Sequence, residues 1–331
     1  VRHVQFARLA EYFEQLEETS SRKALVETLA NMLREAEPEE IDKIVYLCQG
    51  RLVPFFEPLE IGMGEKLVAQ AIASAYRSTR EEVLRRYGQR GDLGLVAQDL
   101  AVGEARHHAQ AADLTVDTVY RCLWQLATTA GSGTVERKLR LLGELLQHMD
   151  ALSAKHVVRI PLGRLRLGIG DPTVLDALSF AKVGSTSLRP ALEAAYNKTS
   201  DLGQVAKTFW QGGREAIAAI RLQVGKPVRP ALAERLPSPE AIIAKLGRCA
   251  VEVKYDGFRC QIHKNGDEVQ VFSRNLENMS AMFPEVVQGV LAQVHAGQAI
   301  LEGEAVSYNP ASEEFYPFQE TTKRRRKYKV D

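Results

Sequence analysis

The spacing of apolar residues changes across a proline-rich stretch at residues 223–239, and this change limits the chain to folds of more than one domain. Before the stretch, apolar residues recur at helical spacing with few β-branched runs. After it, apolar and polar residues alternate as they do in strands. Because prolines cannot sustain a helix, the stretch itself reads as a linker. We therefore predict an all-α domain at residues 1–222, a linker at 223–239, and an α+β domain with antiparallel strands from residue 240.

Several helices of the first domain are delimited by breaks in the pattern. Thr19-Ser20-Ser21 supplies a break and a cap before a second apolar stripe, and Gly50 ends a later one. Stripes at this spacing are typical of helices packed around a core. The best-bounded helices are predicted at residues 65–76, 78–87, 114–129, 134–149 and 153–162.

Composition and charge exclude several classes of protein. With 331 residues, 45% of them hydrophobic, the chain can build two or three domains with proper cores. No stretch resembles a membrane span or a secretory signal. The formal net charge of +1 gives no evidence for a polyanionic partner, so that case depends on local clusters. Four cysteines without metal-ligand spacing favour reduced thiols in a cytosolic protein: Cys48, Cys122, Cys249 and Cys260.

A charged stretch opens the second domain. If residues 251–256 form a strand, successive side chains point to opposite faces. One face is then charged and suited to line a cavity, and the other is apolar and predicted to be buried: Glu252, Lys254 and Asp256 on the first, Val251, Val253 and Tyr255 on the second. From the pattern alone, a surface hairpin of mixed charge is an equally good interpretation.

The remaining strands follow in order. Gly257 permits a sharp turn, after which apolar and polar residues alternate again through residue 263. Asn265-Gly266 fits the centre of a two-residue hairpin turn before a strand at residues 268–274. A helix beginning at Pro284 and a strand at residues 299–308 follow. Glu302 and Glu304 share one face of that last strand.

Two loops of the first domain could hold phosphates. Gly131-Ser132-Gly133 precedes a helix that carries Arg137 and Lys138, and free amides at a helix N-terminus suit an anion. The alternative is a flexible loop between helices. In the second loop, Arg164 and Arg166 lie two residues apart before Gly168, a pattern typical of a clamp on a sugar-phosphate backbone, although solvated arginines would look the same.

These motifs together carry a resemblance to a known family. Residues 254–259, Lys-Tyr-Asp-Gly-Phe-Arg, resemble the first motif of ATP-dependent DNA ligases, within the covalent nucleotidyltransferase superfamily. Residues 273–275 and 302–306 resemble later motifs of that family. Residues 131–133, 165–168, 195–203 and 225–230 are similar to the helical DNA-binding domain and linker of replicative ligases of the archaeal and eukaryotic type. The resemblance covers nearly the whole chain, and the motifs occur in the family's order.

The resemblance implies roles for particular residues, with ATP and Mg²⁺ as cofactors. Lys254 would be the nucleophile that forms lysyl-AMP. The implied nucleotide contacts are Glu252, Arg259, Arg274 and Glu304, and the implied metal ligands are Asp256 and Glu304. The helical domain would bind DNA through Ser132, Gly133, Arg137, Lys138, Arg164, Arg166 and Gly168.

The same resemblance implies a monomer that acts on nicked double-stranded DNA in replication, repair and recombination, with a sliding clamp as a further partner and no membrane association. Its location would be cytoplasmic beside the nucleoid in a prokaryote and nuclear in a eukaryote. Because the sequence stops at Asp331, before the family's later motifs and its OB-fold domain, we expect this fragment to bind DNA but to seal nicks poorly. The alternatives are an RNA ligase or capping-type nucleotidyltransferase, and a non-catalytic DNA-binding module.

Overall fold

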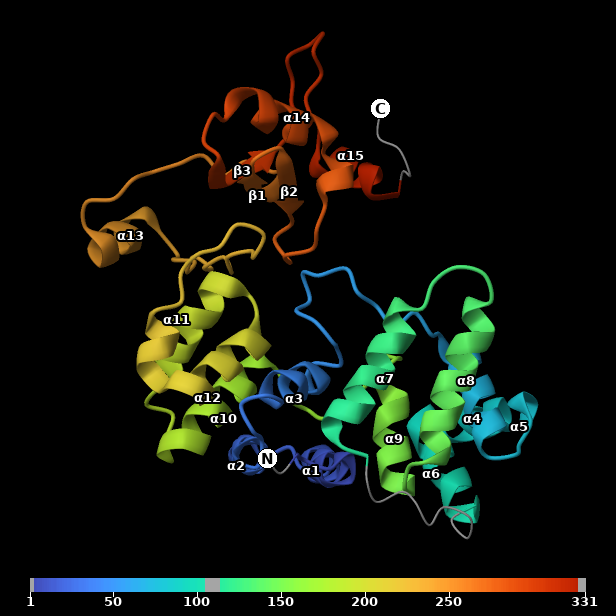
Figure 1. Cartoon of the computed structure of the whole chain (residues 1–331). Helices are drawn as coiled ribbons and strands as arrows, with labels where there is room; N and C mark the ends of the chain where they lie inside the picture. Colours follow the sequence, from blue (N-terminus) through green and yellow to red (C-terminus); the bar gives the residue numbers. More distant parts are fainter. Residues whose placement is uncertain (1–2, 105–113, 327–331) are drawn as a thin grey trace. The chain divides into compact units, whose positions relative to one another are not determined.

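The computed structural model describes residues 3–104 and 114–326, and the chain divides into two compact units (Figure 1). The first unit comprises Val1–Tyr196 and Asp201–Ile220, and the second comprises Asn197–Ser200 and Arg221–Asp331. Each unit has its own hydrophobic core. Within the described ranges, the structure contains no helix that is long and apolar enough to cross a membrane.

The first unit is built from helices. The five helices that were best bounded by sequence all form, with ends within about three residues of the predicted ones. The helices are α1 (Phe6–Glu17), α2 (Arg22–Arg34), α3 (Ile41–Cys48), α4 (Glu65–Ala75), α5 (Arg80–Arg90), α6 (Leu93–Glu104), α7 (Val116–Thr128), α8 (Thr134–Gln147), α9 (Ala151–Arg159), α10 (Asp171–Val183), α11 (Arg189–Thr199) and α12 (Leu202–Ala218).

Local chemistry sets where these helices begin and end. The hydroxyls of Ser21, Thr79 and Thr115 each accept a hydrogen bond from a backbone N–H in the first turn of the helix that follows. A cap of this kind is worth about 1 kcal/mol. At the other end, Gly91 and Gly184 adopt the left-handed conformation that terminates α5 and α10.

The apolar stripes of the helices merge into one core. Figure 1 shows α4 to α9 gathered into a bundle, in which α6 packs on α9 and α4 on α8, while α2 and α3 pack on α10 and α12. Phe13, Leu29, Ile72 and Leu123 are completely buried in this core. Each such side chain contributes about 1.5–3 kcal/mol through burial, so packing rather than surface charge stabilises the unit.

The second unit is an antiparallel three-stranded sheet with short helices. The strand order is β2-β1-β3, and α14 packs against β2. Its small core includes Cys260, Ile262, Val271 and Phe283. The elements are α13 (Pro239–Leu246), β1 (Phe258–Asn265), β2 (Glu268–Phe272), the 3₁₀ turn Ser280–Met282, α14 (Pro284–Gln293), β3 (Gln298–Ala305), α15 (Phe318–Thr322) and the 3₁₀ turn Lys323–Arg326.

The register of the sheet places its polar residues together. Arg259 on β1 lies opposite Glu304 on β3, and Gln261 lies opposite Glu302. Because side chains alternate along a strand, these four side chains share one face, whereas Cys260 belongs to the buried core on the other. The predicted common face of Glu302 and Glu304 is therefore confirmed.

Two predictions about local structure are wrong. Residues 251–256 do not form a strand, because no other segment within the described ranges supplies a hydrogen-bonding ladder to them. The apolar residues predicted to be buried are consequently open to solvent, with Val251 92% exposed and Val253 75% exposed. The hairpin turn is also shifted by one residue. Asn265 pairs with Glu268, so the central residues are Gly266 and Asp267. Of these two, Gly266 alone has positive φ, as in a type II′ turn.

Part of the predicted linker is ordered against the sheet. The N–H of Gly225 donates to His263 Nδ1 at 2.8 Å, and the N–H of Val228 donates to Gln261 Oε1 at 2.7 Å. Pro227 is buried, and the N–H of Arg229 donates to the carbonyl of Asn197 at 2.8 Å. Prolines exclude a helix here, yet they permit a non-helical segment in which the N–H groups of Gly225 and Val228 are bonded to β1 side chains.

Candidate nucleotide pocket and nucleic-acid interface

A cavity of about 770 Å³ in the second unit gathers all four residues predicted to contact a nucleotide, together with Lys254. Lys254 and Glu252 reach it from the extended segment that precedes β1, Arg259 from β1 itself, Arg274 from the turn after β2, and Glu304 from β3. Five residues from four separate segments therefore converge on one cavity. Its volume lies in the range of pockets that bind small molecules.

Asp256, a predicted metal ligand, does not line this cavity. Conversely, the cavity includes residues that the sequence pattern did not indicate. One wall comes from residues 230–233, directly after the segment ordered on β1, and another from Phe318 on α15. Nothing in the local pattern of residues 230–233 or of Phe318 points to a pocket, because only the path of the chain brings them to it.

The close approach of β3 explains why residue 257 in the charged stretch is a glycine. A Cβ atom at this position would lie 2.6 Å from the carbonyl oxygen of Ala305 and 2.8 Å from Val306 Cγ2. Both distances are shorter than any ordinary carbon contact, so β3 can approach this closely only when residue 257 has no side chain. The Gly257 N–H also donates to Glu304 Oε1 at 3.2 Å. The glycine thus brings Glu304 beside the segment that carries Lys254.

One cationic group of the pocket, Arg259, is paired with a carboxylate outside the pocket lining. The Arg259 guanidinium donates to both carboxylate oxygens of Glu302, at 2.9 and 2.8 Å. Arg259 and Glu302 are about two-fifths exposed, so the pair orients the arginine more than it stabilises the fold. Ser273 orders the turn that presents Arg274, because its hydroxyl accepts from the N–H groups of Asn275 and Glu277. That hydroxyl is a supporting group that the motif alone did not identify.

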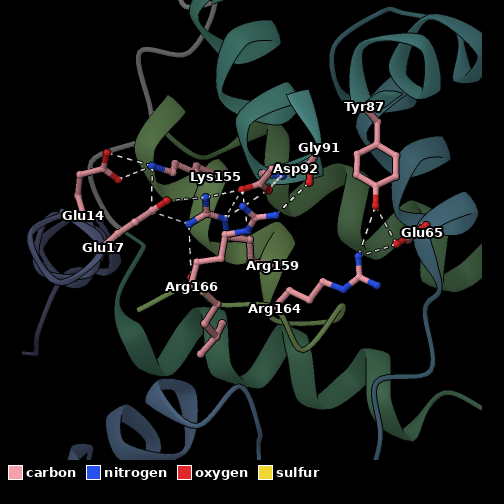
Figure 2. A network of polar contacts seen from close by, with 12 residues as sticks. Glu14, Glu17, Glu65, Tyr87, Gly91, Asp92, Lys155, Arg159, Arg164 and Arg166 are labelled. Atoms are coloured by element: carbon pink, nitrogen blue, oxygen red, sulfur yellow. Dashed lines mark hydrogen bonds and ion pairs between the residues drawn. The ribbon is translucent and has the colours of Figure 1, made fainter. Parts of the chain in front are cut away.

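In the first unit, the two predicted clamp arginines lie in the loop after α9, and Figure 2 shows the network around them. Arg164 donates to Glu65 Oε1 at 2.8 Å and lies 3.4 Å from the Tyr87 hydroxyl. Arg166 has a φ of 61°, a left-handed conformation that is uncommon outside glycine, and donates to the Gly91 carbonyl at 3.0 Å. Both side chains remain more than half exposed, so each guanidinium can still meet a ligand from solvent.

A buried ion network supports Arg166 from behind (Figure 2). The Asp92 carboxylate lies 3.4 Å from Arg166 and also accepts two hydrogen bonds from Arg159, at 3.1 and 2.5 Å. Arg159 is 1% exposed and bonds Glu17 as well. Burial alone would raise the pKa of the Asp92 carboxyl, but the hydrogen bonds and charge of Arg159 outweigh burial and lower it. Asp92 is thus ionised and fixed beneath Arg166, a role that the sequence did not reveal.

The predicted phosphate loop before α8 is only partly available to a ligand. Gly133 is the N-cap of α8 with a left-handed φ of 71°, and Arg137 folds back onto the loop by donating to the Ala130 carbonyl at 2.7 Å. Lys138 differs from the expectation. It is 7% exposed, and its ammonium donates to the Ile61 carbonyl at 2.6 Å. Because Lys138 lies on the core side of the amphipathic helix, it serves packing at the place where a surface contact was predicted.

A helical domain followed by a sheet domain, with a cavity lined by lysine, arginine and glutamate side chains, is the class that these two units define. Comparison with known families makes the class specific. A family model described as the DNA ligase N terminus matches residues 5–179, and one described as the ATP dependent DNA ligase domain matches residues 230–331. The chain belongs to the ATP-dependent DNA ligase family.

The curated relatives of this chain are named as DNA ligases. A probable DNA ligase of Dictyoglomus thermophilum is 49% identical over 98% of this chain and 55% of its own length. The DNA ligase 2 of Thermofilum pendens is 43% identical over 98% of this chain and 55% of its own length. The DNA ligase of Sulfurisphaera tokodaii is 44% identical over 99% of this chain and 56% of its own length. The chain therefore spans about half the length of the curated relatives it matches.

Proposed function

We propose that this chain contains the DNA-binding domain and the nucleophile-bearing part of an ATP-dependent DNA ligase. The observation that carries the proposal is the convergence of Lys254, Arg259, Arg274 and Glu304 on one cavity. These residues come from separate segments, and each matches a family motif. A surface hairpin of mixed charge, the alternative left open by the pattern, would not gather them around a common space.

The chemistry proposed for Lys254 is attack on the α-phosphorus of ATP. The lysine nitrogen forms the N–P bond with its lone pair, the bond from the phosphorus to the bridging oxygen breaks, and pyrophosphate leaves with that electron pair. The amine must be deprotonated first, and ordinary lysine amines have a pKa near ~10.4. Arg259 and Arg274 line the same cavity. They also stand where phosphate charge would be neutralised.

A magnesium ion fits this donor set in part. Glu304 places a carboxylate in the cavity, and carboxylate oxygen is a ligand type that Mg²⁺ prefers. Asp256 is not among the residues that line the cavity, so Glu304 is the first candidate for the metal and the role of Asp256 stays a prediction. When bound, the ion would supply charge neutralisation of the phosphates.

Two later steps complete the proposed reaction. AMP is transferred to the 5′-phosphate of a nick, and the 3′-hydroxyl then displaces AMP to seal the strand. We propose nicked duplex DNA as the substrate, bound by a monomer through Arg164, Arg166, Gly168 and the loop that holds Ser132, Gly133 and Arg137. A sliding clamp is the further partner proposed from the family. Lys138 is left out of this surface because its ammonium is buried.

Covalent labelling with ATP that carries radioactive α-phosphate tests the nucleophile. We expect label on the unaltered chain and on Lys245→Ala, a matched change at an exposed lysine of α13, and none on Lys254→Ala. Label that persists in Lys254→Ala would refute the assignment. Competition by unlabelled GTP would favour a capping-type enzyme. The assay should also be run on a chain extended to the relatives' length, where an absence of label would favour a non-catalytic DNA-binding module.

A further inference from the structure

The polar face of β1 holds a complete hydrogen-bond network that joins the nucleotide cavity to the segment at residues 225–229. Gln261 and His263 follow Arg259 at two-residue steps on the same face. Gln261 is 4% exposed and His263 is 1% exposed. A buried polar group costs free energy unless it is hydrogen-bonded. The hydrogen-bond partners of these two side chains therefore show which segment the side chains hold in place.

Every hydrogen-bonding position of the Gln261 amide is occupied. Its Oε1 accepts from the Val228 N–H at 2.7 Å and lies 2.8 Å from His263 Nε2. Its Nε2 donates to the Val228 carbonyl at 2.9 Å and to Glu302 Oε1 at 3.3 Å. The amide therefore bonds both backbone groups of Val228 as a neighbouring strand would, and specifies which residue lies there.

His263 completes the network in one tautomer. Its Nδ1 accepts from the Gly225 N–H, so the proton must be on Nε2, which donates to Gln261. Burial lowers the pKa of His263 to about 4, which agrees with a neutral ring that accepts at Nδ1. The ring is also held edge-on against Phe272 at 5.1 Å between centroids. The histidine is thus fixed in place and in protonation state.

The network has consequences at both of its ends. At one end, Glu302 accepts from Arg259, which lines the cavity. At the other, residues 230–233 follow the bonded segment directly and form a wall of the same cavity. With Val228 bonded to Gln261, the wall begins two residues further along the chain from a point fixed on β1.

We propose that Gln261 and His263 are positioning residues that build the nucleotide cavity by holding the 225–229 segment on β1. They contact no reacting atom. The proposal rests on the proposed nucleotide function, and it assigns the pair to nucleotide affinity and not to the rate of the chemical step.

The test uses the whole chain and two measurements on Gln261→Ala and His263→Ala. Backbone amide hydrogen exchange should be at least about tenfold faster at Gly225 in both variants and at Val228 in Gln261→Ala, because loss of each hydrogen bond opens the segment. In the Lys254 labelling reaction, the KM for ATP should rise about tenfold while the rate at saturating ATP stays within about twofold. Matched controls are Gln298→Ala and His295→Ala, exposed residues outside the network.

A second variant guards against misfolding of the sheet. Val228→Pro removes the N–H that donates a hydrogen bond to Gln261 Oε1, and it leaves the sequence of β1 unchanged. It should therefore give the same rise in the KM for ATP. Unchanged exchange would show that the pair does not hold the segment. Faster exchange with an unchanged KM would show that the segment does not shape the cavity. A fall in rate without a rise in KM would also overturn the proposal. A chain extended to the relatives' length that takes no label would refute the nucleotide site itself, and exchange would still report on the pair.

Discussion

Gly257 shows how a single missing side chain organises the candidate site. Its backbone passes so close to β3 that a methyl group would press against the Ala305 carbonyl. The same closeness lets its N–H reach Glu304. The glycine is needed for close approach here, because its φ does not lie in the left-handed region.

Gly257→Ala should therefore destabilise the second unit by about 1–3 kcal/mol, the usual cost of forcing a methyl group into a packed site. It should also lower labelling of Lys254, because the segment and β3 must separate. Urea unfolding and the labelling assay measure the two effects. Gly289→Ala is the control, since a Cβ at residue 289 in α14 meets nothing within 4 Å and should be neutral or slightly stabilising. Equal stability of both variants would contradict the steric argument.

Arg164→Ala and Arg166→Ala should each weaken binding to duplex DNA about equally for all sequences. An arginine that binds phosphate carries no base readout, and its removal should lower the slope of log K against log salt by about 1. Binding measured across a salt series checks this. Lys23→Ala is the control, because Lys23 is exposed on α2 beside Glu27 and outside the proposed surface. A strong sequence preference, or an unchanged slope in both variants, would contradict a backbone-binding role.

Among the helices, Arg159 is the point where three elements meet. It lies at the end of α9 and bonds Glu17 of α1 and Asp92 immediately before α6, while Lys155 on α9 donates to Glu14 at 2.7 Å. A buried ion network adds little net stability compared with apolar packing, but removal of one member leaves charges without compensation. The network is therefore best understood as fixing Asp92 beneath Arg166.

Arg159→Met should cost about 3–5 kcal/mol, since Asp92 would keep a buried charge without its main partner and Glu17, one-quarter exposed, would keep only Lys155. It should also weaken DNA binding by the protein that is still folded, because Arg166 would lose the fixed carboxylate that holds it. Thermal unfolding and DNA binding at a temperature where the variant is folded separate the two effects. DNA affinity equal to that of the unaltered chain would show that Arg166 needs no such support.

Across the molecule as a whole, each unit holds a buried histidine that folds in its neutral form. Burial lowers the pKa of His156, and its hydrogen bond with Glu14 only partly offsets that effect. Burial likewise lowers the pKa of His263 to about 4. The unfolded chain therefore binds more protons than the folded chain in this range, so stability rises with pH. The contribution is complete above the ordinary pKa of 6.5 and is lost as the pH falls toward 4.

Lowering the pH from 7 to 5 should thus cost about 2 kcal/mol for His263, at 1.36 kcal/mol per pH unit below the unfolded pKa, with a loss in the same direction for His156. Urea unfolding at the two pH values measures the change. The variants His263→Gln and His156→Gln should each flatten the pH dependence of the unit that contains the substitution. A steeper loss of stability in either variant would reverse the sign of the argument.

Features that depend on local pattern could be predicted from the amino-acid sequence. Helical spacing placed the helices of the first unit to within a few residues, and the alternation through residue 263 placed β1. Several motifs together identified the family, and those at residues 254–259, 273–275 and 302–306, with Glu252, supplied five residues that share one cavity. Such features are readable because periodicity and motif chemistry are carried by residues close together in the chain.

Features that depend on partners distant in the chain emerged only from the folded structure. The segment at residues 251–256 alternates like a strand yet has no ladder within the described ranges, and Lys138 looks like a surface cation yet bonds the Ile61 carbonyl in the core. The prolines after residue 223 suggested a free linker, but Gln261 and His263, more than thirty residues later, bind it to the sheet. Strand pairing, burial and hydrogen-bond satisfaction are properties of two segments at once, and neither segment's sequence contains the other's position.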